Sequence, residues 1–129
     1  MGARFDLVTL DAVDSVSLAR FWSDALGLVE VEREDNGRWI VLAEVDSGSR
    51  RMGIQRIVGL TAASAGWEGN AKGRIHLDLA CSPQSFEDEV ARLVACGAVL
   101  VRAVRRESYG SIATMVDPEG NIFDLCAYQ

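Results

Sequence analysis

The stretch His76-Leu77-Asp78-Leu79 decides the fold, because it opens the second copy of a segment that begins at Leu7-Val8-Thr9-Leu10. Each opening is followed by a helix that ends at glycine, a strand, a turn and further strands. Four pairs of landmarks keep a nearly constant offset: Leu7 and His76 lie 69 residues apart, Gly27 and Gly97 lie 70, Asp46 and Asp117 lie 71, and Gln55 and Asp124 lie 69. A constant offset indicates two copies of one β-α-β-β-β unit.

This repeat predicts an α+β fold of two βαβββ modules within a single domain, residues 1–129. Module one spans about residues 4–57, a glycine-rich linker about 58–73, and module two about 74–129. We expect a curved mixed sheet with the helices on its convex face, and a hairpin turn at Asn36-Gly37. A half of this size would be marginally stable alone, so we expect the halves to fold together.

Both predicted helices have a cap, an apolar stripe and a terminating glycine. The first begins near Asp14-Ser15 and ends at Gly27, and the second begins with Ser82 and Pro83 and ends at Gly97. The stripes that we expect to face the sheet are Leu18, Phe21, Trp22, Ala25 and Leu26 in the first helix and Phe86, Val90, Leu93 and Val94 in the second.

Composition excludes several classes of protein. The net charge is −6, and the only adjacent basic pairs, Arg50-Arg51 and Arg105-Arg106, are interpreted as solvated surface charges, so we expect no nucleic-acid partner. No apolar run has the length of a membrane span, and the N-terminus has no export signal, so we expect a cytoplasmic protein without a membrane partner. Cys81, Cys96 and Cys126 are odd in number and widely spaced, which favours reduced thiols.

Three stretches, together with the doubled unit, resemble a known superfamily. They are Ala25-Leu26-Gly27-Leu28, His76-Leu77-Asp78-Leu79 and Asp117-Pro118-Glu119-Gly120-Asn121-Ile122-Phe123-Asp124-Leu125. The pattern resembles the vicinal oxygen chelate superfamily, in particular its glyoxalase-like branch, and the likeness covers nearly the whole chain. That superfamily includes glyoxalase I, extradiol dioxygenases, fosfomycin-resistance transferases and bleomycin-resistance binding proteins. The resemblance implies a homodimer, with the modules paired within one chain or exchanged between chains.

The resemblance also implies where a metal would bind. Metal-dependent members hold a divalent ion with one side chain from the first and one from the last strand of each unit, and the internal repeat maps these positions onto Leu7, Gln55, His76 and Asp124. A leucine cannot ligate a metal, so the candidate ligands are Gln55, His76 and Asp124. The single histidine disfavours an extradiol-type iron site, which needs two.

The period of two along a strand gives these residues a common face. His76 and Asp78 share one face of their strand while Leu77 and Leu79 share the other, which we expect to meet the helix. Asp124, together with Gln55, Thr9 and Asp11 of the first unit, is expected to point toward the same cavity.

Two functions remain open, and the residues do not decide whether the protein is an enzyme. The first is a binding module that sequesters a small organic molecule without a complete metal site, with either no cofactor or a divalent metal. The second is a metal-dependent lyase or isomerase of the glyoxalase type, in which Asp78 handles the proton. The vacant ligand position at Leu7 favours the first. Candidate ligand-binding residues are Trp39, Met52, Trp67, Tyr109 and Met115 as walls, and Gln55, His76, Asp78 and Asp124 as polar anchors. Trp67 either covers the pocket as a lid or packs on the other module or a dimer partner.

Overall fold

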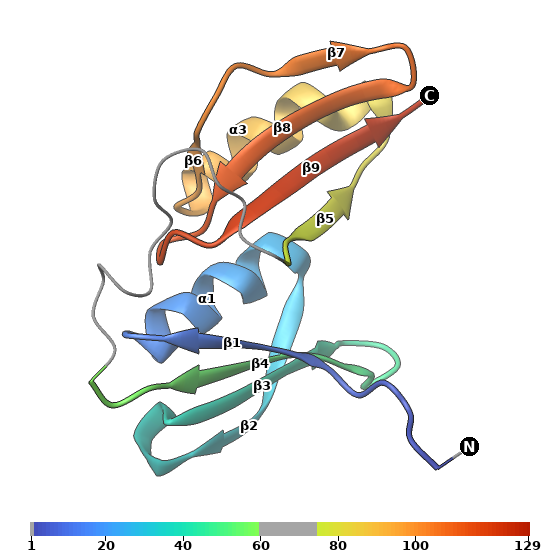
Figure 1. Cartoon of the computed structure of the whole chain (residues 1–129). Helices are drawn as coiled ribbons and strands as arrows, with labels where there is room; N and C mark the ends of the chain where they lie inside the picture. Colours follow the sequence, from blue (N-terminus) through green and yellow to red (C-terminus); the bar gives the residue numbers. More distant parts are fainter. Residues whose placement is uncertain (1, 60–74) are drawn as a thin grey trace. The chain divides into compact units, whose positions relative to one another are not determined.

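The chain consists of two compact units, Met1–Ala65 and Gly66–Gln129. The computed structural model describes residues 2–59 and 75–129. Each unit has its own mixed sheet with a helix packed on it, so the α+β class and the doubled order of elements are confirmed (Figure 1). Most of the predicted linker, Trp67 included, lies outside the described residues.

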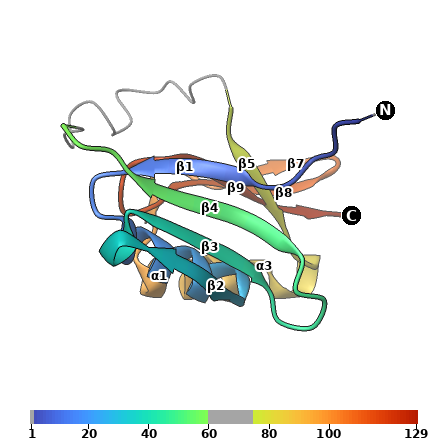
Figure 2. The ribbon, with the colours of Figure 1, turned by 90° about the horizontal axis from the view of Figure 1, so that it is seen from below.

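The first unit has a four-stranded sheet in the order β1-β4-β3-β2. Its elements are β1 (Val8–Ala12), α1 (Ser15–Leu26), β2 (Leu28–Glu34), the short 3-10 helix η1 (Asp35–Gly37), β3 (Trp39–Glu44) and β4 (Arg50–Arg56). β1 is parallel to β4, and the other pairs are antiparallel. Figure 2 shows β4 between β1 and β3, which makes it a central strand.

Helix α1 begins and ends where its sequence predicts. The Asp14 carboxylate accepts a hydrogen bond from the Ser17 backbone N–H at 3.1 Å, and Gly27 ends the helix in the left-handed conformation at φ 66°. The predicted stripe is buried except at Leu26, whose exposed fraction is 38%. Burial of this stripe against the sheet gives the first unit its core.

The first hairpin has a longer turn than Asn36-Gly37 alone. Asp35, Asn36 and Gly37 all have positive φ angles, 47°, 56° and 92°. Strand β2 ends at Glu34, directly before these three residues, and the chain reverses over them. Asn and Asp tolerate this region of φ better than most residues, which is why the turn can include Asp35.

The second unit has a five-stranded sheet in the order β5-β9-β8-β6, with β7 also paired to β8. Its elements are β5 (Leu77–Ala80), the 3-10 helix η2 (Pro83–Ser85), α3 (Phe86–Cys96), β6 (Val99–Leu100), β7 (Arg105–Glu107), β8 (Gly110–Val116) and β9 (Ile122–Tyr128). β5 and β9 are parallel, and β9 lies between β5 and β8 in Figure 1.

The second helix begins with a 3-10 turn. The Ser82 hydroxyl accepts a hydrogen bond from the Ser85 backbone N–H at 3.3 Å, as expected of a cap, but the α-helix proper starts only at Phe86. Phe86 and Leu93 are each 1% exposed, whereas Val94 of the predicted stripe is 47% exposed. The core contact of α3 is therefore narrower than its sequence indicates.

The turn before β9 is organised by one carboxylate. Asp117 is 2% exposed, and its Oδ1 accepts hydrogen bonds from the backbone N–H groups of Glu119 at 2.9 Å and Asn121 at 3.0 Å. Its Oδ2 accepts a third from the Asn121 side-chain amide at 2.9 Å. This network fixes where β9 begins, and so positions the residues that β9 carries.

None of the helices in residues 2–59 and 75–129 combines the length and the apolar character that crossing a membrane requires.

Candidate functional site

The two faces of the second sheet are distinguished by what Arg106 contacts. Arg106 and Ser111 are paired across β7 and β8, and the Arg106 guanidinium binds both the Ser111 hydroxyl at 2.7 Å and Glu87 of α3 at 2.6 Å. This side therefore faces the helix. Since neighbouring residues of a strand point to opposite faces, the other side is the helix-free face. Register places His76, Asp78, Ile112, Thr114, Ile122, Asp124, Cys126 and Tyr128 on that face.

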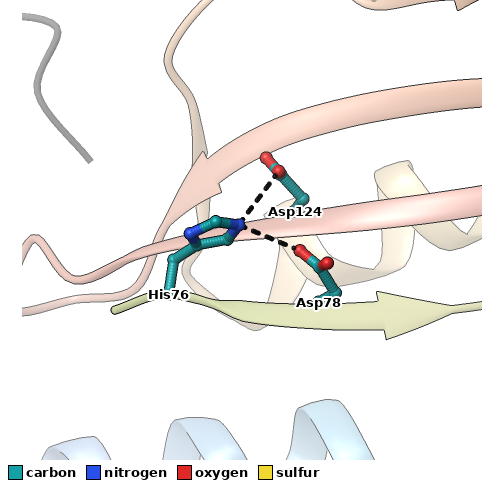
Figure 3. Close-up of side chains that lie close together, drawn as sticks. All are labelled: His76, Asp78 and Asp124. Atoms are coloured by element: carbon teal, nitrogen blue, oxygen red, sulfur yellow. Dashed lines mark ion pairs between the residues drawn. The ribbon is translucent and has the colours of Figure 1, made fainter. Parts of the chain in front are cut away.

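Three polar side chains meet on the helix-free face (Figure 3). His76 Nε2 lies 3.2 Å from Asp78 Oδ1 and 3.7 Å from Asp124 Oδ2. One possible ligand atom from each residue falls within 4.8 Å of the others. The side chains are 33%, 57% and 7% exposed in that order, so the group runs from solvent into the sheet. The common face predicted for His76, Asp78 and Asp124 is the observed one.

Asp124 is the buried end of this group. Its Oδ1 accepts a hydrogen bond from the Thr114 hydroxyl at 2.6 Å. Asp78, Asp124 and Thr114 stand in one row across β5, β9 and β8, because the register pairs Asp124 with both of the others. A hydrogen bond to a carboxylate offsets part of the cost of burying it. Sequence reasoning missed Thr114, although the alternation of β8 opposite β9 was the available signal.

Tyrosines mark the far end of the same face. The rings of Tyr109 and Tyr128 lie 6.3 Å apart between centroids. The pKa of Tyr128 is raised to about 12, mainly by the hydrogen bond that links Tyr128 to Cys126, and nearby Asp78 makes a smaller contribution to this rise. Tyr109 therefore lies beside residues of the helix-free face.

Met115 is not on that face. It is paired with Phe123, points to the helix side and is 0% exposed. The structure places it in the core of the second unit rather than with the three polar side chains.

Strand register changes the internal equivalence drawn from the 69-residue offset. In the first unit Thr9 pairs with Gly53, and in the second Asp78 pairs with Asp124. Thr9 corresponds to Asp78 when Leu7 corresponds to His76, so the counterpart of Asp124 is Gly53 and not Gln55. The reason is that the last strands are offset by 71 residues, as the turns at Asp46 and Asp117 are.

Gln55 and Trp39 face each other in the first unit. They are paired across β4 and β3, with Gln55 exposed and Trp39 half-buried. Met52 of the predicted walls is 3% exposed and belongs to the first unit's core. Leu7 is half-buried and precedes β1. A metal-ligand role for Gln55 stays a prediction.

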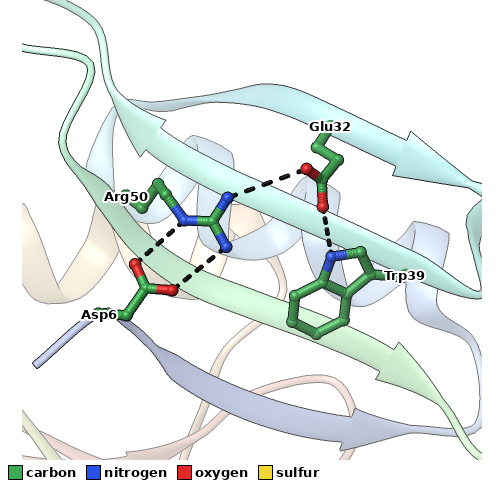
Figure 4. Close-up of polar contacts among 4 residues, drawn as sticks. All are labelled: Asp6, Glu32, Trp39 and Arg50. Carbon is green, nitrogen blue, oxygen red and sulfur yellow. Dashed lines mark hydrogen bonds and ion pairs between the residues drawn. The ribbon is translucent and has the colours of Figure 1, made fainter. Parts of the chain in front are cut away.

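The Trp39 ring lies over Gly53. A chain of polar contacts through Glu32, Arg50 and Asp6 holds the ring (Figure 4). Its indole N–H donates to Glu32 at 2.5 Å. Glu32 lies 3.9 Å from Arg50, which binds Asp6 through two nitrogens at 3.1 and 3.3 Å. A Cβ at Gly53 would lie 2.4 Å from the ring, so this position has no room for a side chain such as aspartate.

The sequence matches one family model. Residues 7–126 match the model of the glyoxalase-like domain. The chain belongs to this glyoxalase-like family. Among curated proteins, no sequence matches it. The family membership confirms the resemblance to the vicinal oxygen chelate superfamily.

Solved structures with the glyoxalase-like fold are similar over nearly the full chain. A glyoxalase/bleomycin resistance protein/dioxygenase family enzyme from Burkholderia phytofirmans PsJN has a TM-score of 0.74 at 20% identity, covering 98% of this chain and 100% of its own. A glyoxalase-related enzyme from Fulvimarina pelagi has a TM-score of 0.69 at 21% identity, covering 96% and 87%. The fosfomycin resistance protein FosX from Listeria monocytogenes has a TM-score of 0.71 at 15% identity, covering 100% and 94%. At these identities the likeness shows the fold.

Proposed function

We propose that this glyoxalase-like protein binds a small organic molecule on the helix-free face of its second unit, with His76, Asp78 and Asp124 as polar anchors. The observation that carries the proposal is that His76, whose side chain is 33% exposed, lies between the buried Asp124 and the exposed Asp78. Such a group offers both a donor and acceptors to a ligand that approaches from solvent.

The surroundings of the group suit an organic ligand. Ile112, Ile122 and Cys126 lie on the same face and are 8%, 7% and 3% exposed. Tyr109 and Tyr128, 50% and 53% exposed, add aromatic surface at one end. Apolar and aromatic side chains around a few polar groups are typical of small-molecule sites.

The first unit lacks a matching polar group. The counterparts of His76, Asp78 and Asp124 by strand register are Leu7, Thr9 and Gly53. Leucine and glycine side chains offer no metal ligand, which argues against the four-ligand site that the resemblance implies. This difference between the units favours binding over metal-dependent catalysis.

A metal-dependent lyase or isomerase is the second candidate, and the donor set of the second unit supports it. One imidazole and two carboxylates are ligands that divalent transition metals accept. Ligand atoms about 2.1 Å from one ion lie at most about 4.2 Å apart, so the group within 4.8 Å would need a small adjustment, which the exposed Asp78 allows. His76, Asp78 and Asp124 would hold the ion, and a bound ion would polarise an oxygen of the substrate.

Metal content and ligand binding test the two candidates together. Protein purified without chelator would be analysed for metal beside the His76→Ala variant. Its thermal stability would then be measured with a panel of small organic molecules that includes fosfomycin and bleomycin. Asp124→Asn tests the site, and Asp88→Asn, an exposed residue of α3, is the matched control.

A ligand that stabilises the wild type and Asp88→Asn but not Asp124→Asn would support the proposal. Near-stoichiometric metal that disappears with His76→Ala would make the lyase or isomerase the leading function. Metal-free protein that no molecule of the panel stabilises would contradict both.

A further inference from the structure

Arg105 and Arg106 are neighbours on β7 with different surroundings. Arg106 faces the helix side, where it pairs with Glu87 and lies 5.3 Å above the Phe86 ring centroid. Arg105 is paired with Ile112 and therefore points to the helix-free face. The sequence-based interpretation of both as solvated surface charges is wrong for Arg105, which is half-buried.

Arg105 has an unsatisfied donor. Its Nε is buried and has no hydrogen-bond partner. Within residues 2–59 and 75–129, no acid forms an ion pair with its guanidinium. Nearly all buried donors in proteins are paired, and leaving one unpaired costs free energy. A buried guanidinium nitrogen without a partner therefore indicates that an acceptor is missing.

Strand order relates Arg105 to the polar group. Arg105 stands in one row with Ile112 and Cys126, and Asp124 lies two residues further along β9. Two strand spacings of about 4.8 Å and one step of about 7 Å along the strand put the Cα atoms of Arg105 and Asp124 about 12 Å apart. The side chains of both residues span part of this distance. A small molecule that contacts both ends would span this distance along the row that Ile112 and Cys126 occupy.

We propose that Arg105 binds the anionic group, a carboxylate or a phosphonate, of the small molecule whose other end contacts His76 and Asp124. This rests on the proposed function and adds the chemical class of the ligand. A guanidinium matches both anions because it donates two parallel hydrogen bonds.

The acids on the same face orient such a ligand. Asp78 and Asp124 would repel an anionic group at the His76 end, and Glu107, which is exposed and shares the face, lies beyond Arg105 on β7. Arg105 lies between these acids, and its positive charge attracts an anion there. The ligand is thus an organic anion with its charge at one end and a neutral or hydrogen-bond-donating group at the other.

The test compares Arg105→Gln with Arg106→Gln, because the two variants lose the same charge from adjacent residues on opposite faces. The probes are fosfomycin, phenylphosphonate and phenylacetate, with phenylacetamide as the neutral match. Binding is measured by ligand-observed NMR and isothermal titration calorimetry, and folding by circular dichroism. We expect at least one anion to bind the wild type and Arg106→Gln similarly, and to bind Arg105→Gln at least about tenfold more weakly. Phenylacetamide should bind all three more weakly than phenylacetate binds the wild type.

Two results would overturn the proposal. One is anion binding that Arg105→Gln retains or that both variants weaken equally. The other is a failure of every anion to bind the wild type. In that second case, a neutral or cationic molecule that binds in an Asp124-dependent manner would keep the proposed function and reject only the role of Arg105. If no molecule binds at all, both proposals fail.

Discussion

At the scale of single residues, the second unit depends on keeping a carboxylate inside a sheet. Asp124 is 5% exposed and has apolar neighbours on its own strand. Burial disfavours a charged side chain unless hydrogen bonds compensate for lost hydration. Thr114 supplies one such bond at 2.6 Å, and His76 approaches the other oxygen at 3.7 Å. The helix-free face, on which we propose ligand binding, therefore carries a buried carboxylate whose burial costs free energy.

Replacement of Thr114 tests this directly. Thr114→Val keeps the shape but removes the donor, so we expect the free energy of unfolding to fall by about 1.5–3 kcal/mol, the range for hydrogen bonds to charged groups. Thr114→Ser keeps the hydroxyl and should cost about 1 kcal/mol for the lost methyl. Urea denaturation measures both. A Thr114→Val variant as stable as the wild type would show that the hydrogen bond to Asp124 does not stabilise the fold.

The part of the polar group that depends on the alternation of side chains along one strand was predictable from the sequence. A period of two places His76 and Asp78 on one face, and their observed contact agrees. The equivalence of Gln55 with Asp124 was not predictable in the same way, because it depends on register. A bulge between Leu42 and Ala43 and turns of different form alter the count between strands. The half-buried position of Arg105 was not predicted for another reason: β7 has three residues, which are too few to show an alternation of buried and exposed side chains.

At the scale of elements, the helix caps give a prediction with a defined dependence on pH. Two hydrogen bonds from Ser17 lower the pKa of the Asp14 carboxyl. The backbone N–H makes the larger contribution and the hydroxyl the next. A lowered pKa in the folded state means that the ionised form stabilises the fold. This stabilisation is present above the ordinary pKa of aspartate and is lost as the pH falls through the folded value.

Asp14→Ala should therefore cost about 1 kcal/mol at neutral pH, as other N-cap replacements do. The difference from wild type should narrow as the pH falls below about 4. Asp14→Asn keeps an acceptor without the charge, so its smaller loss should depend less on pH. Chemical denaturation across this range measures all three proteins. A difference that stays constant between neutral and acidic pH would rule out the carboxylate as the stabilising group.

The sheet of the first unit gives a packing prediction. Gly53→Ala would bring its Cβ to 2.4 and 2.8 Å from two ring carbons of Trp39 and to 3.0 Å from the Thr9 hydroxyl. The ring is held at Glu32, so we expect a loss of about 1–3 kcal/mol in the free energy of unfolding and a shift in tryptophan emission. In a Trp39→Leu background the same change should cost less. If the cost is the same in both backgrounds, the ring is not the cause.

The order of elements was predictable because repeats and caps are local signals. The second half departs in its middle, where the expected single strand is divided into β6 and β7 on either end of β8. Both pair with β8, and the residues between them form no strand, although the Val101 backbone N–H donates a hydrogen bond to the Thr114 carbonyl of β8 at 3.1 Å. Such an interruption depends on tertiary pairing, and local patterns do not show it.

At the scale of the whole molecule, the two units share an element order but not their chemistry. The second carries the polar group, whereas the first fills the matching position with Trp39 over Gly53. In the first unit a tryptophan ring fills this position, and in the second unit polar side chains occupy it. This difference is consistent with binding on the second unit alone. The net charge of −6 adds nothing to the choice of ligand, because local charges on the helix-free face decide it.

Size alone predicts that the units unfold together, since a half of this chain would be only marginally stable by itself. The reporters are already separated: Trp22 and Trp39 lie in the first unit, and both tyrosines, Tyr109 and Tyr128, lie in the second. In a Trp67→Phe background, tryptophan fluorescence follows the first unit, and fluorotyrosine NMR follows the second.

Thr114→Val removes a hydrogen bond in the second unit only, and we expect it to lower the denaturation midpoints of both reporters by the same amount. Thr114→Ser, which keeps the bond, should move both midpoints less. A shift confined to the fluorotyrosine signal would contradict a single cooperative transition. In that case the second unit has a stability of its own, and the hydrogen bond that supports Asp124 would govern ligand binding without the first unit.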